Sequence, residues 1–139
     1  MSARVGLQVA HRRYVPYGHA HYGGALVDGA YLLGLFGDVA TELCIRGDGD
    51  EGLFASYADV QFRAPVRAGD VVEARGQIIR VGNRSRTIEF SCVVVCRAQP
   101  ERGGSAAQVL EPPLVAAVAT GTVVVPSPTV AGEAVASDG

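Results

Sequence analysis

A long apolar segment, residues 25–46, places the strongest constraint on the fold of this chain. Its sequence, ALVDGAYLLGLFGDVATELCIR, is long enough for about six helical turns and is apolar on nearly every side of a helical wheel. A surface helix has a polar face, whereas a helix of this kind must be covered on most sides to be stable in water. We therefore expect a buried helix that begins at residue 25 and ends before the stretch GDGDEG (47–52), with other elements packed around it.

The other segments with a regular pattern are predicted to be strands. Apolar residues alternate at Arg4–Val9, where the first strand is expected. Turns at 64–69 and 82–85 and a surface loop at 99–111 separate four later strands, expected at 53–63, 70–81, 86–97 and 114–125. Residues 126–139 are small and turn-forming, so they are expected to be a disordered tail after a single domain that spans residues 1–125.

One strand, one buried helix and four further strands make an α+β domain. An antiparallel sheet of about five strands that curls around a long central helix covers that helix with the elements available, and this arrangement is the hotdog fold. Another α+β arrangement of the same elements is the alternative. One sheet of this size leaves part of the helix uncovered, so at least a homodimer is expected, and a tetramer or hexamer stays open.

The composition argues against several classes of protein. Twelve basic and fourteen acidic residues give a net charge of −2, which does not favour a nucleic-acid partner. No apolar run reaches the ~20 residues of a membrane helix, so no membrane association is expected. The three cysteines lie in apolar runs and are expected to be buried thiols of a cytoplasmic protein, without a disulfide framework. Their spacing does not suggest a metal site.

Three carboxylates fall on one stripe of the predicted helix. At about 100° per residue, Asp28, Asp38 and Glu42 lie within an arc of roughly 80°. Buried charge is costly, so this stripe faces either water or a cleft where a carboxylate does chemistry. The helix dipole suits Asp28, and an ion pair with Arg63 or Arg75 would explain Asp38. The dipole disfavours Glu42, which is therefore predicted to be a desolvated general acid or base with a raised pKa, with Asp38 as its partner.

The residues before the helix, HAHYGG (19–24), are predicted to contact a ligand. Gly23 and Gly24 allow close approach of the backbone, and N–H groups at a helix N-terminus favour an oxygen that gains negative charge. Such donors are effective in acyl chemistry. His21 and Tyr22 are predicted to hydrogen-bond the substrate, with a structural histidine as the alternative.

Basic residues gather at two of the predicted turns. Arg84 and Arg86 lie beside the turn residues Gly82 and Asn83, and Arg63 lies at the preceding turn. Arginine suits bidentate contact with phosphate, so these five residues are candidates for binding the phosphates of a nucleotide. Solvated surface arginines are the alternative for each one.

Several segments together resemble the hotdog-fold 3-aminobutyryl-CoA and β-alanyl-CoA ammonia-lyase family. The resemblance lies in HAHYGGALVDGA (19–30) and LFGDVATEL (35–43). It continues through DGDEGLF (48–54), APVRAGD (64–70), VGNRS (81–85), EPPL (111–114) and ATGT (119–122). It covers most of the chain from about residue 17 to 125, and the combined set is far more specific than any single segment.

The resemblance implies reversible loss of ammonia from a β-aminoacyl-CoA to give an enoyl-CoA. It implies coenzyme A as part of the substrate and no permanently bound cofactor. Asp28, Asp38 and Glu42 belong to the shared motif with His21 and Tyr22, and the resemblance assigns none of them an individual role. The family pattern also implies an asparagine where this chain has an alanine, at position 25, so a different acyl group is one possible consequence.

Three other functions fit the same residues. An acyl-CoA thioesterase would activate water against the same carbonyl, and an enoyl-CoA hydratase would add water instead of ammonia. A non-catalytic acyl-CoA-binding module would use the carboxylates only in ion pairs. Fold alone does not separate these functions. Tyr57, with Asp59, is a candidate for contacting substrate from a second subunit.

Overall fold

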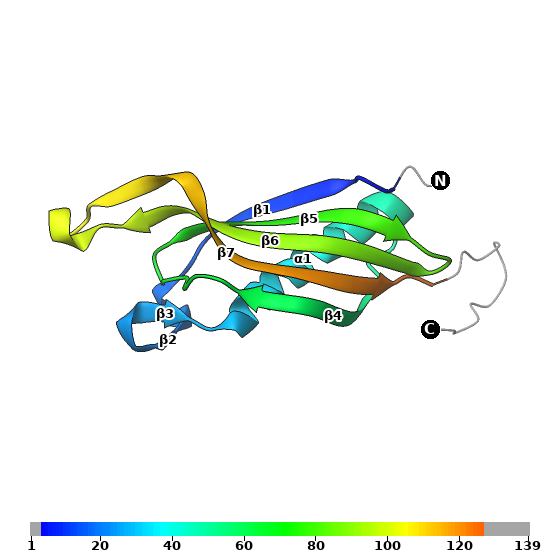
Figure 1. Ribbon diagram of the computed structural model, residues 1–139, viewed down its shortest axis with the longest axis horizontal. Helices are drawn as coiled ribbons and strands as arrows, with labels where there is room; N and C mark the ends of the chain where they lie inside the picture. Colours follow the sequence, from blue (N-terminus) through cyan, green and yellow to red (C-terminus); the bar gives the residue numbers. More distant parts are fainter. Residues whose placement is uncertain (1–3, 127–139) are drawn as a thin grey trace.

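The computed structural model describes residues 4–126, and Figure 1 shows the arrangement of their elements. The long elements are β1 (Gln8–Tyr14), α1 (Gly29–Asp48), β4 (Leu53–Phe62), β5 (Val71–Val81), β6 (Ser85–Ala98) and β7 (Ala107–Val124). The short elements are η1 (Tyr17–His19), β2 (Ala20–Tyr22), η2 (Gly23–Ala25), β3 (Leu26–Val27) and η3 (Pro100–Arg102). The predicted tail, 126–139, lies outside the described residues except for its first residue.

A five-stranded antiparallel sheet in the order β1-β5-β6-β7-β4 carries α1 on one face. Strands β2 and β3 form a separate small sheet beside the N-terminal end of α1. The predicted α+β hotdog domain is therefore confirmed. None of the helices within residues 4–126 is long and apolar enough to cross a membrane.

The core lies between α1 and the sheet. Val72, Ala74 and Ile78 alternate along β5 toward the helix and are fully buried. Between them, a Cβ on Gly76 would lie 2.7 Å from Val39 Cγ1, so the helix approaches the sheet as closely as a glycine allows. This contact fixes the height of α1 above the sheet.

The helix begins four residues later than predicted. Asp28 is its N-cap, and the residues before it form a 3-10 turn and the short strand β3, because Val27 N donates to Val66 O (2.8 Å). The helix ends two residues later than predicted, where Gly49 takes a left-handed conformation (φ 66°). The apolar pattern predicted the helix correctly but could not place its ends.

The helix also has an uncovered stripe. Ala30, Gly34, Asp38 and Thr41 recur at helical spacing and are exposed. The small size of most of these residues explains why the helix looked apolar on every side in the sequence. The sheet therefore leaves part of the helix uncovered, as predicted from its size.

The first strand lies later in the chain than the predicted range, Arg4–Val9. Residues 4–6 form a turn in which Gly6 has a positive φ (93°), and β1 starts at Gln8. Strand β1 is an edge strand paired only with β5 in the sheet, so Arg12 and Arg13 remain exposed in it, while His11 contacts Glu42 of α1. The run of polar residues hid this continuation of the strand.

The predicted loop at 99–111 is largely a hairpin arm. Strand β7 starts at Ala107 and pairs with the far end of β6, where Cys96 faces Val109. The arm extends well beyond the rest of the sheet (Figure 1), and only the residues around η3 form its loop. Small and polar residues at 103–108 gave the appearance of a longer loop.

The cysteines agree with the predicted buried thiols in two of three cases. Cys44 and Cys92 are buried and Cys96 is half-buried, and all three are free. Burial raises the pKa of Cys44 to about 11 and that of Cys92 to about 12. These two thiols are therefore protonated and chemically inert at neutral pH.

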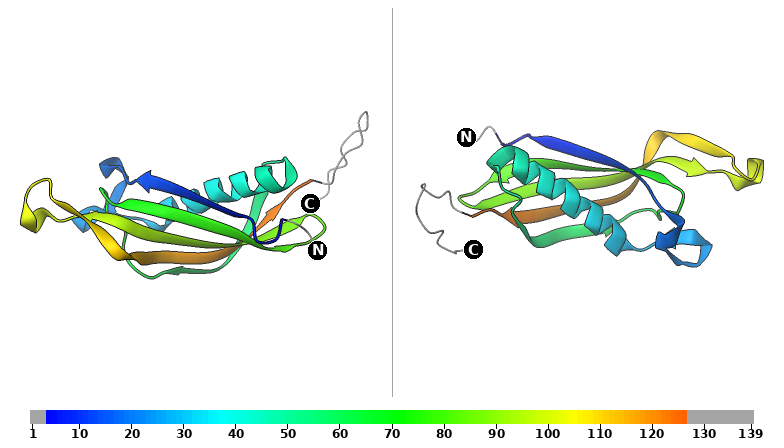
Figure 2. Two further views of the ribbon diagram at one scale, coloured as in Figure 1. Left: turned by 90° about the horizontal axis from the view of Figure 1, so that it is seen from above. Right: turned by 180° about the vertical axis from the view of Figure 1, so that it is seen from behind.

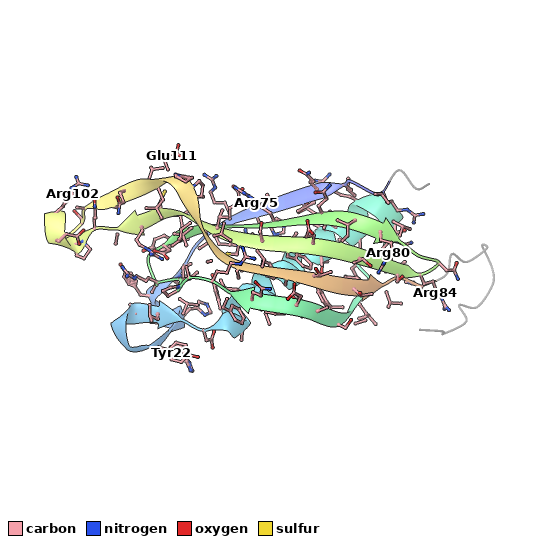
Figure 3. All side chains as sticks on the ribbon, viewed as in Figure 1. Tyr22, Arg75, Arg80, Arg84, Arg102 and Glu111 are labelled. Carbon is pink, nitrogen blue, oxygen red and sulfur yellow. The ribbon has the colours of Figure 1, made fainter. Side chains whose placement is uncertain are left out.

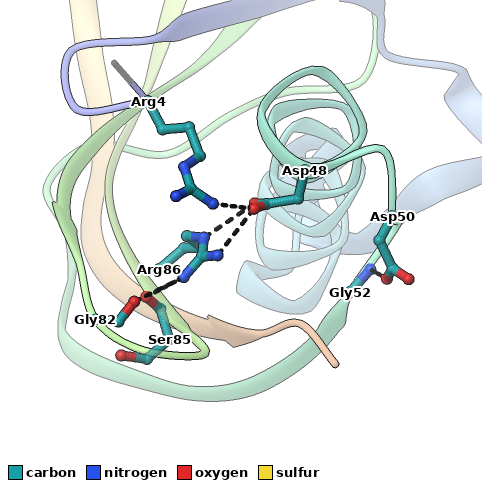
Figure 4. A network of polar contacts seen from close by, with 7 residues as sticks. All are labelled: Arg4, Asp48, Asp50, Gly52, Gly82, Ser85 and Arg86. Carbon is teal, nitrogen blue, oxygen red and sulfur yellow. Dashed lines mark hydrogen bonds and ion pairs between the residues drawn. The ribbon is translucent and has the colours of Figure 1, made fainter. Parts of the chain in front are cut away.

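A charged network joins the C-terminal end of α1 to the β5–β6 turn (Figure 4). Arg86 is buried and donates twice to Asp48, at 2.9 and 2.8 Å. Its remaining donors reach the carbonyl oxygens of Gly82 and Ser85, at 3.1 and 2.9 Å. Arg4 also donates to Asp48. The prediction that Arg86 binds a phosphate is therefore wrong, because its guanidinium is buried and its donors are in use.

The Asp48→Asn variant is expected to lose about 3 kcal/mol of unfolding free energy at pH 7, because buried Arg86 loses its counter-charge. Urea denaturation followed by circular dichroism measures this loss. Hydrogen bonds from Arg86 hold the pKa of Asp48 below its usual value. Wild type should therefore keep this stabilisation above about pH 4 and lose it as the pH falls through the folded-state pKa, whereas Asp48→Asn should lack that loss.

Glu51→Gln is the matched control, because Glu51 is an exposed acid in the same segment. The same acid dependence in wild type and Asp48→Asn would contradict this role of Asp48.

Candidate active site

The N-terminal end of α1 holds a partly exposed carboxylate, Asp28. One of its oxygens, Oδ1, accepts from Tyr31 N at 3.2 Å and caps the helix. The other, Oδ2, lies 3.9 Å from His21 Nδ1. Capping therefore explains the position of Asp28, as the alternative from the helix dipole proposed, and still leaves one oxygen facing the imidazole.

Two aromatic ring pairs involve residues next to this carboxylate in the chain or in contact with it. His21 packs edge-on against Tyr22 with the ring centroids 4.6 Å apart, and His19 packs against Tyr31 at the same separation. His21, Tyr22 and Asp28 thus come together as predicted, with Tyr22 57% exposed. The cluster can hold a cation by charge and by ring faces, and can exchange a proton through the imidazole.

The two glycines do not lie at the helix N-terminus. Gly23 and Gly24 belong to η2, five or more residues before α1, and Gly24 has a positive φ (73°). Ala25 follows it with φ 60°, a conformation that alanine rarely adopts, and its carbonyl accepts from Ala68 N (2.8 Å). The glycines are therefore separated from the helix by the short strand β3, and their contact with a substrate stays a prediction.

Glu42 is not the desolvated carboxylate that was predicted. His11 Nε2 lies 2.7 Å from one of its oxygens, and Arg46 Nε donates to the other at 2.7 Å. These two contacts, that of His11 first, lower the pKa of Glu42. The side chain is partly exposed and ties edge strand β1 to α1, so it has the structural explanation that the sequence did not reveal.

Asp38 is an exposed carboxylate on the uncovered stripe of α1. The predicted pairing is wrong, because Arg63 donates to Gln61 Oε1 and Arg75 to Glu73 Oε2. Asp38 has no hydrogen-bond or ion-pair partner among residues 4–126. In the single chain, about 15 Å of helix separates it from Asp28, so the two do not meet.

Tyr57 faces the helix from the middle of β4. Its hydroxyl donates to Leu33 O at 2.9 Å, and its ring packs against those of Phe54 and Phe90. Burial raises its pKa to about 12. The hydroxyl is therefore engaged within the chain, which weakens the prediction that Tyr57 contacts substrate.

The five predicted phosphate-binding residues do not form one cluster. Gly82 and Asn83 lie with Arg84 at the end of the molecule opposite Tyr22, as Figure 3 shows for Arg84 and Tyr22. Arg63 follows the far end of β4, about seven residues, or roughly 23 Å, along the sheet. A single phosphate site that includes both groups is therefore ruled out in one chain.

A groove of 740 Å³ crosses the sheet face opposite α1. Its lining includes Arg63, Arg75, Glu73 and Glu89, so charges of both signs occur in it. Hydrogen bonds from Arg12 and then Arg75 lower the pKa of Glu73. The groove lies away from Asp28, and no cluster of three metal-ligating side chains occurs in the described part of the chain.

Comparisons with known proteins decide the family. The model of the thioesterase superfamily matches residues 17–91. The 3-aminobutyryl-CoA ammonia lyase of Acetoanaerobium sticklandii is 55% identical over 107 residues, which are 77% of this chain and 85% of that protein. The solved β-alanyl-CoA:ammonia lyase from Clostridium propionicum superposes with a TM-score of 0.82 at 39% identity, over 87% of this chain and 86% of that one. The chain belongs to the CoA-ester ammonia-lyase family.

Within the thioesterase superfamily, other structures share only the fold of this ammonia-lyase family member. A hexameric hotdog-fold thioesterase of Campylobacter jejuni superposes with a TM-score of 0.66 at 17% identity, over 82% of this chain and 79% of that one. The two ammonia-lyase matches, at 55% and 39% identity, confirm the resemblance to the ammonia-lyase family that the sequence motifs indicated.

Two residues that shape this family member were not predicted from the sequence. His11 was not expected in a strand, so its contact with Glu42 could not be foreseen. Phe62 lies in the correctly predicted strand β4, but its ring packs on Gly29 beside Asp28. The sequence feature that could have indicated this contact is Gly29, which directly follows the N-cap residue Asp28.

Glu42→Gln is expected to keep kcat within about threefold of wild type, because His11 and Arg46 already engage both oxygens of Glu42 in a partly exposed ion-pair network. The melting temperature should fall at neutral pH, where the ionised carboxylate holds His11 and Arg46. Steady-state kinetics and a thermal melt measure the two effects. Loss of turnover with an unchanged melting temperature would return Glu42 to a catalytic role.

Proposed function

We propose that this protein catalyses the reversible elimination of ammonia from a short β-aminoacyl-CoA, giving an enoyl-CoA. The observation that carries the proposal is the paired carboxylate and imidazole of Asp28 and His21 in a chain 55% identical to a 3-aminobutyryl-CoA ammonia lyase. The thioesterases that share the fold are more distant, so hydrolysis is the weaker alternative. Coenzyme A enters as part of the substrate.

The elimination needs a base for the α-proton and a site for the departing nitrogen. The base takes the α-proton, the electron pair forms the Cα–Cβ double bond, and the Cβ–N bond breaks to release ammonia. The proton then leaves the base, so the products are the enoyl-CoA and an ammonium ion. A negative, aromatic-lined site attracts the substrate's β-ammonium group and accepts the departing nitrogen.

Asp28 and His21 suit the nitrogen site. Asp28 Oδ2 faces the imidazole, and the nearby ring of Tyr22 adds a face that favours a cation. The carboxylate is partly exposed, so a charged group reaches it without the full cost of burial. These three residues therefore bind and orient the ammonium group in our proposal.

Asp38 of a second copy suits the role of base. Strand β4 is an open edge of the sheet, and a two-fold axis through its middle would join two sheets edge to edge. Tyr57, at the middle of β4, contacts Leu33, so Leu33 is the part of α1 nearest that axis. Asp28 lies five residues before Leu33 and Asp38 five residues after it, which brings Asp38 of one copy toward Asp28 of the other.

The first test follows the enoyl chromophore of crotonyl-CoA and acryloyl-CoA with the purified protein, with and without ammonium. Ammonium-dependent loss of absorbance without thiol release is the expected result. Loss of absorbance without ammonium indicates a hydratase, thiol release indicates a thioesterase, and no change indicates a binding module. Each of these three results contradicts the proposal.

A further inference from the structure

We propose that Phe62 closes the acyl end of the site and thereby limits the enzyme to short acyl chains. The inference rests on the proposed function only in placing the acyl group beside Asp28. Gly29 is part of the same feature, because the absence of a side chain at position 29 allows the Phe62 ring to pack against the start of α1.

The ring of Phe62 occupies the space where a side chain at position 29 would lie. A Cβ built on Gly29 would be 2.5 Å from Phe62 Cζ and 2.8–2.9 Å from its Cε atoms. No side chain larger than hydrogen fits there unless the ring moves. The ring is nevertheless 54% exposed, so it presents apolar surface outward directly beside the capping carboxylate.

An irregularity in β4 turns Phe62 toward the helix. Tyr57 and Phe62 are five residues apart, and in a regular strand they would lie on opposite faces. The register with β7 shifts between Ala58 and Gln61, where Asp59 takes a positive φ (54°). A bulge of this kind adds one residue and reverses the faces that follow it, so both rings point to α1.

The chemistry of the acyl group explains why such a wall affects specificity. If the β-ammonium group contacts Asp28, any carbons beyond the β-carbon extend from that point. The exposed ring that packs on the adjacent residue, Gly29, is the apolar surface close to them. A rigid ring excludes a longer chain, and each additional or missing methylene in an apolar pocket changes specificity by about tenfold or more.

The test measures the dissociation constants of propionyl-, butyryl- and hexanoyl-CoA by titration calorimetry, which requires no turnover. Phe62→Ala is expected to improve hexanoyl-CoA binding relative to butyryl-CoA by about tenfold. Gly29→Ala should change the same ratio by about threefold or more in the wild-type background and leave it unchanged in the Phe62→Ala background, because the displaced ring is then absent.

Ile79→Ala is the matched control, since Ile79 is an exposed apolar residue near the far end of β5, a strand that is not next to β4 in the sheet. Phe62→Leu provides a second variant if Phe62→Ala melts early, and it should shift the ratio in the same direction. A ratio within twofold of wild type in both Phe62 variants would overturn the inference. Failure of wild type to consume enoyl-CoA with ammonium, with the binding shift intact, would overturn the proposed function alone.

Discussion

The close contact between α1 and β5 sets the position of the helix that carries Asp28, Asp38 and Glu42. Gly76 lets the helix descend until Val39 meets the backbone of the sheet, and the stacked rings of Phe36 and Phe90, 5.0 Å apart, fill the space beside this contact. A larger residue at position 76 would lift the helix, because packed cores do not compress. The two ends of the helix, where Asp28 and Asp48 lie, would move with it.

The two ends of α1 perform different tasks because their surroundings differ. At the C-terminal end, Asp48 and Arg86 are buried against each other and hold the β5–β6 turn to the helix. At the N-terminal end, Asp28 is partly exposed and keeps one oxygen beside His21. A satisfied buried charge pair stabilises an arrangement, whereas a partly exposed carboxylate beside an imidazole can bind a cation and exchange protons.

The sequence predicted the architecture well because periodicity reports burial directly. The long apolar segment predicted α1, and the alternation of apolar and polar residues predicted most of the later strands. Pairwise contacts were less predictable: Glu42 looked unexplained only because its partner His11 lies in a strand that the pattern misplaced. Arg86 was predicted to bind phosphate because local sequence cannot show that its guanidinium pairs with Asp48, which is distant in the chain. Side chains joined across the fold are not encoded in local spacing.

The most direct test of the central claim, a site shared between two copies, is complementation between two inactive variants. Asp28→Asn and Asp38→Asn should each be inactive in ammonium-dependent consumption of enoyl-CoA. When the two variants are co-expressed and assemble at random, about a quarter of the sites should contain both native carboxylates and restore that fraction of wild-type activity. A mixture as inactive as the separate variants would contradict the shared site.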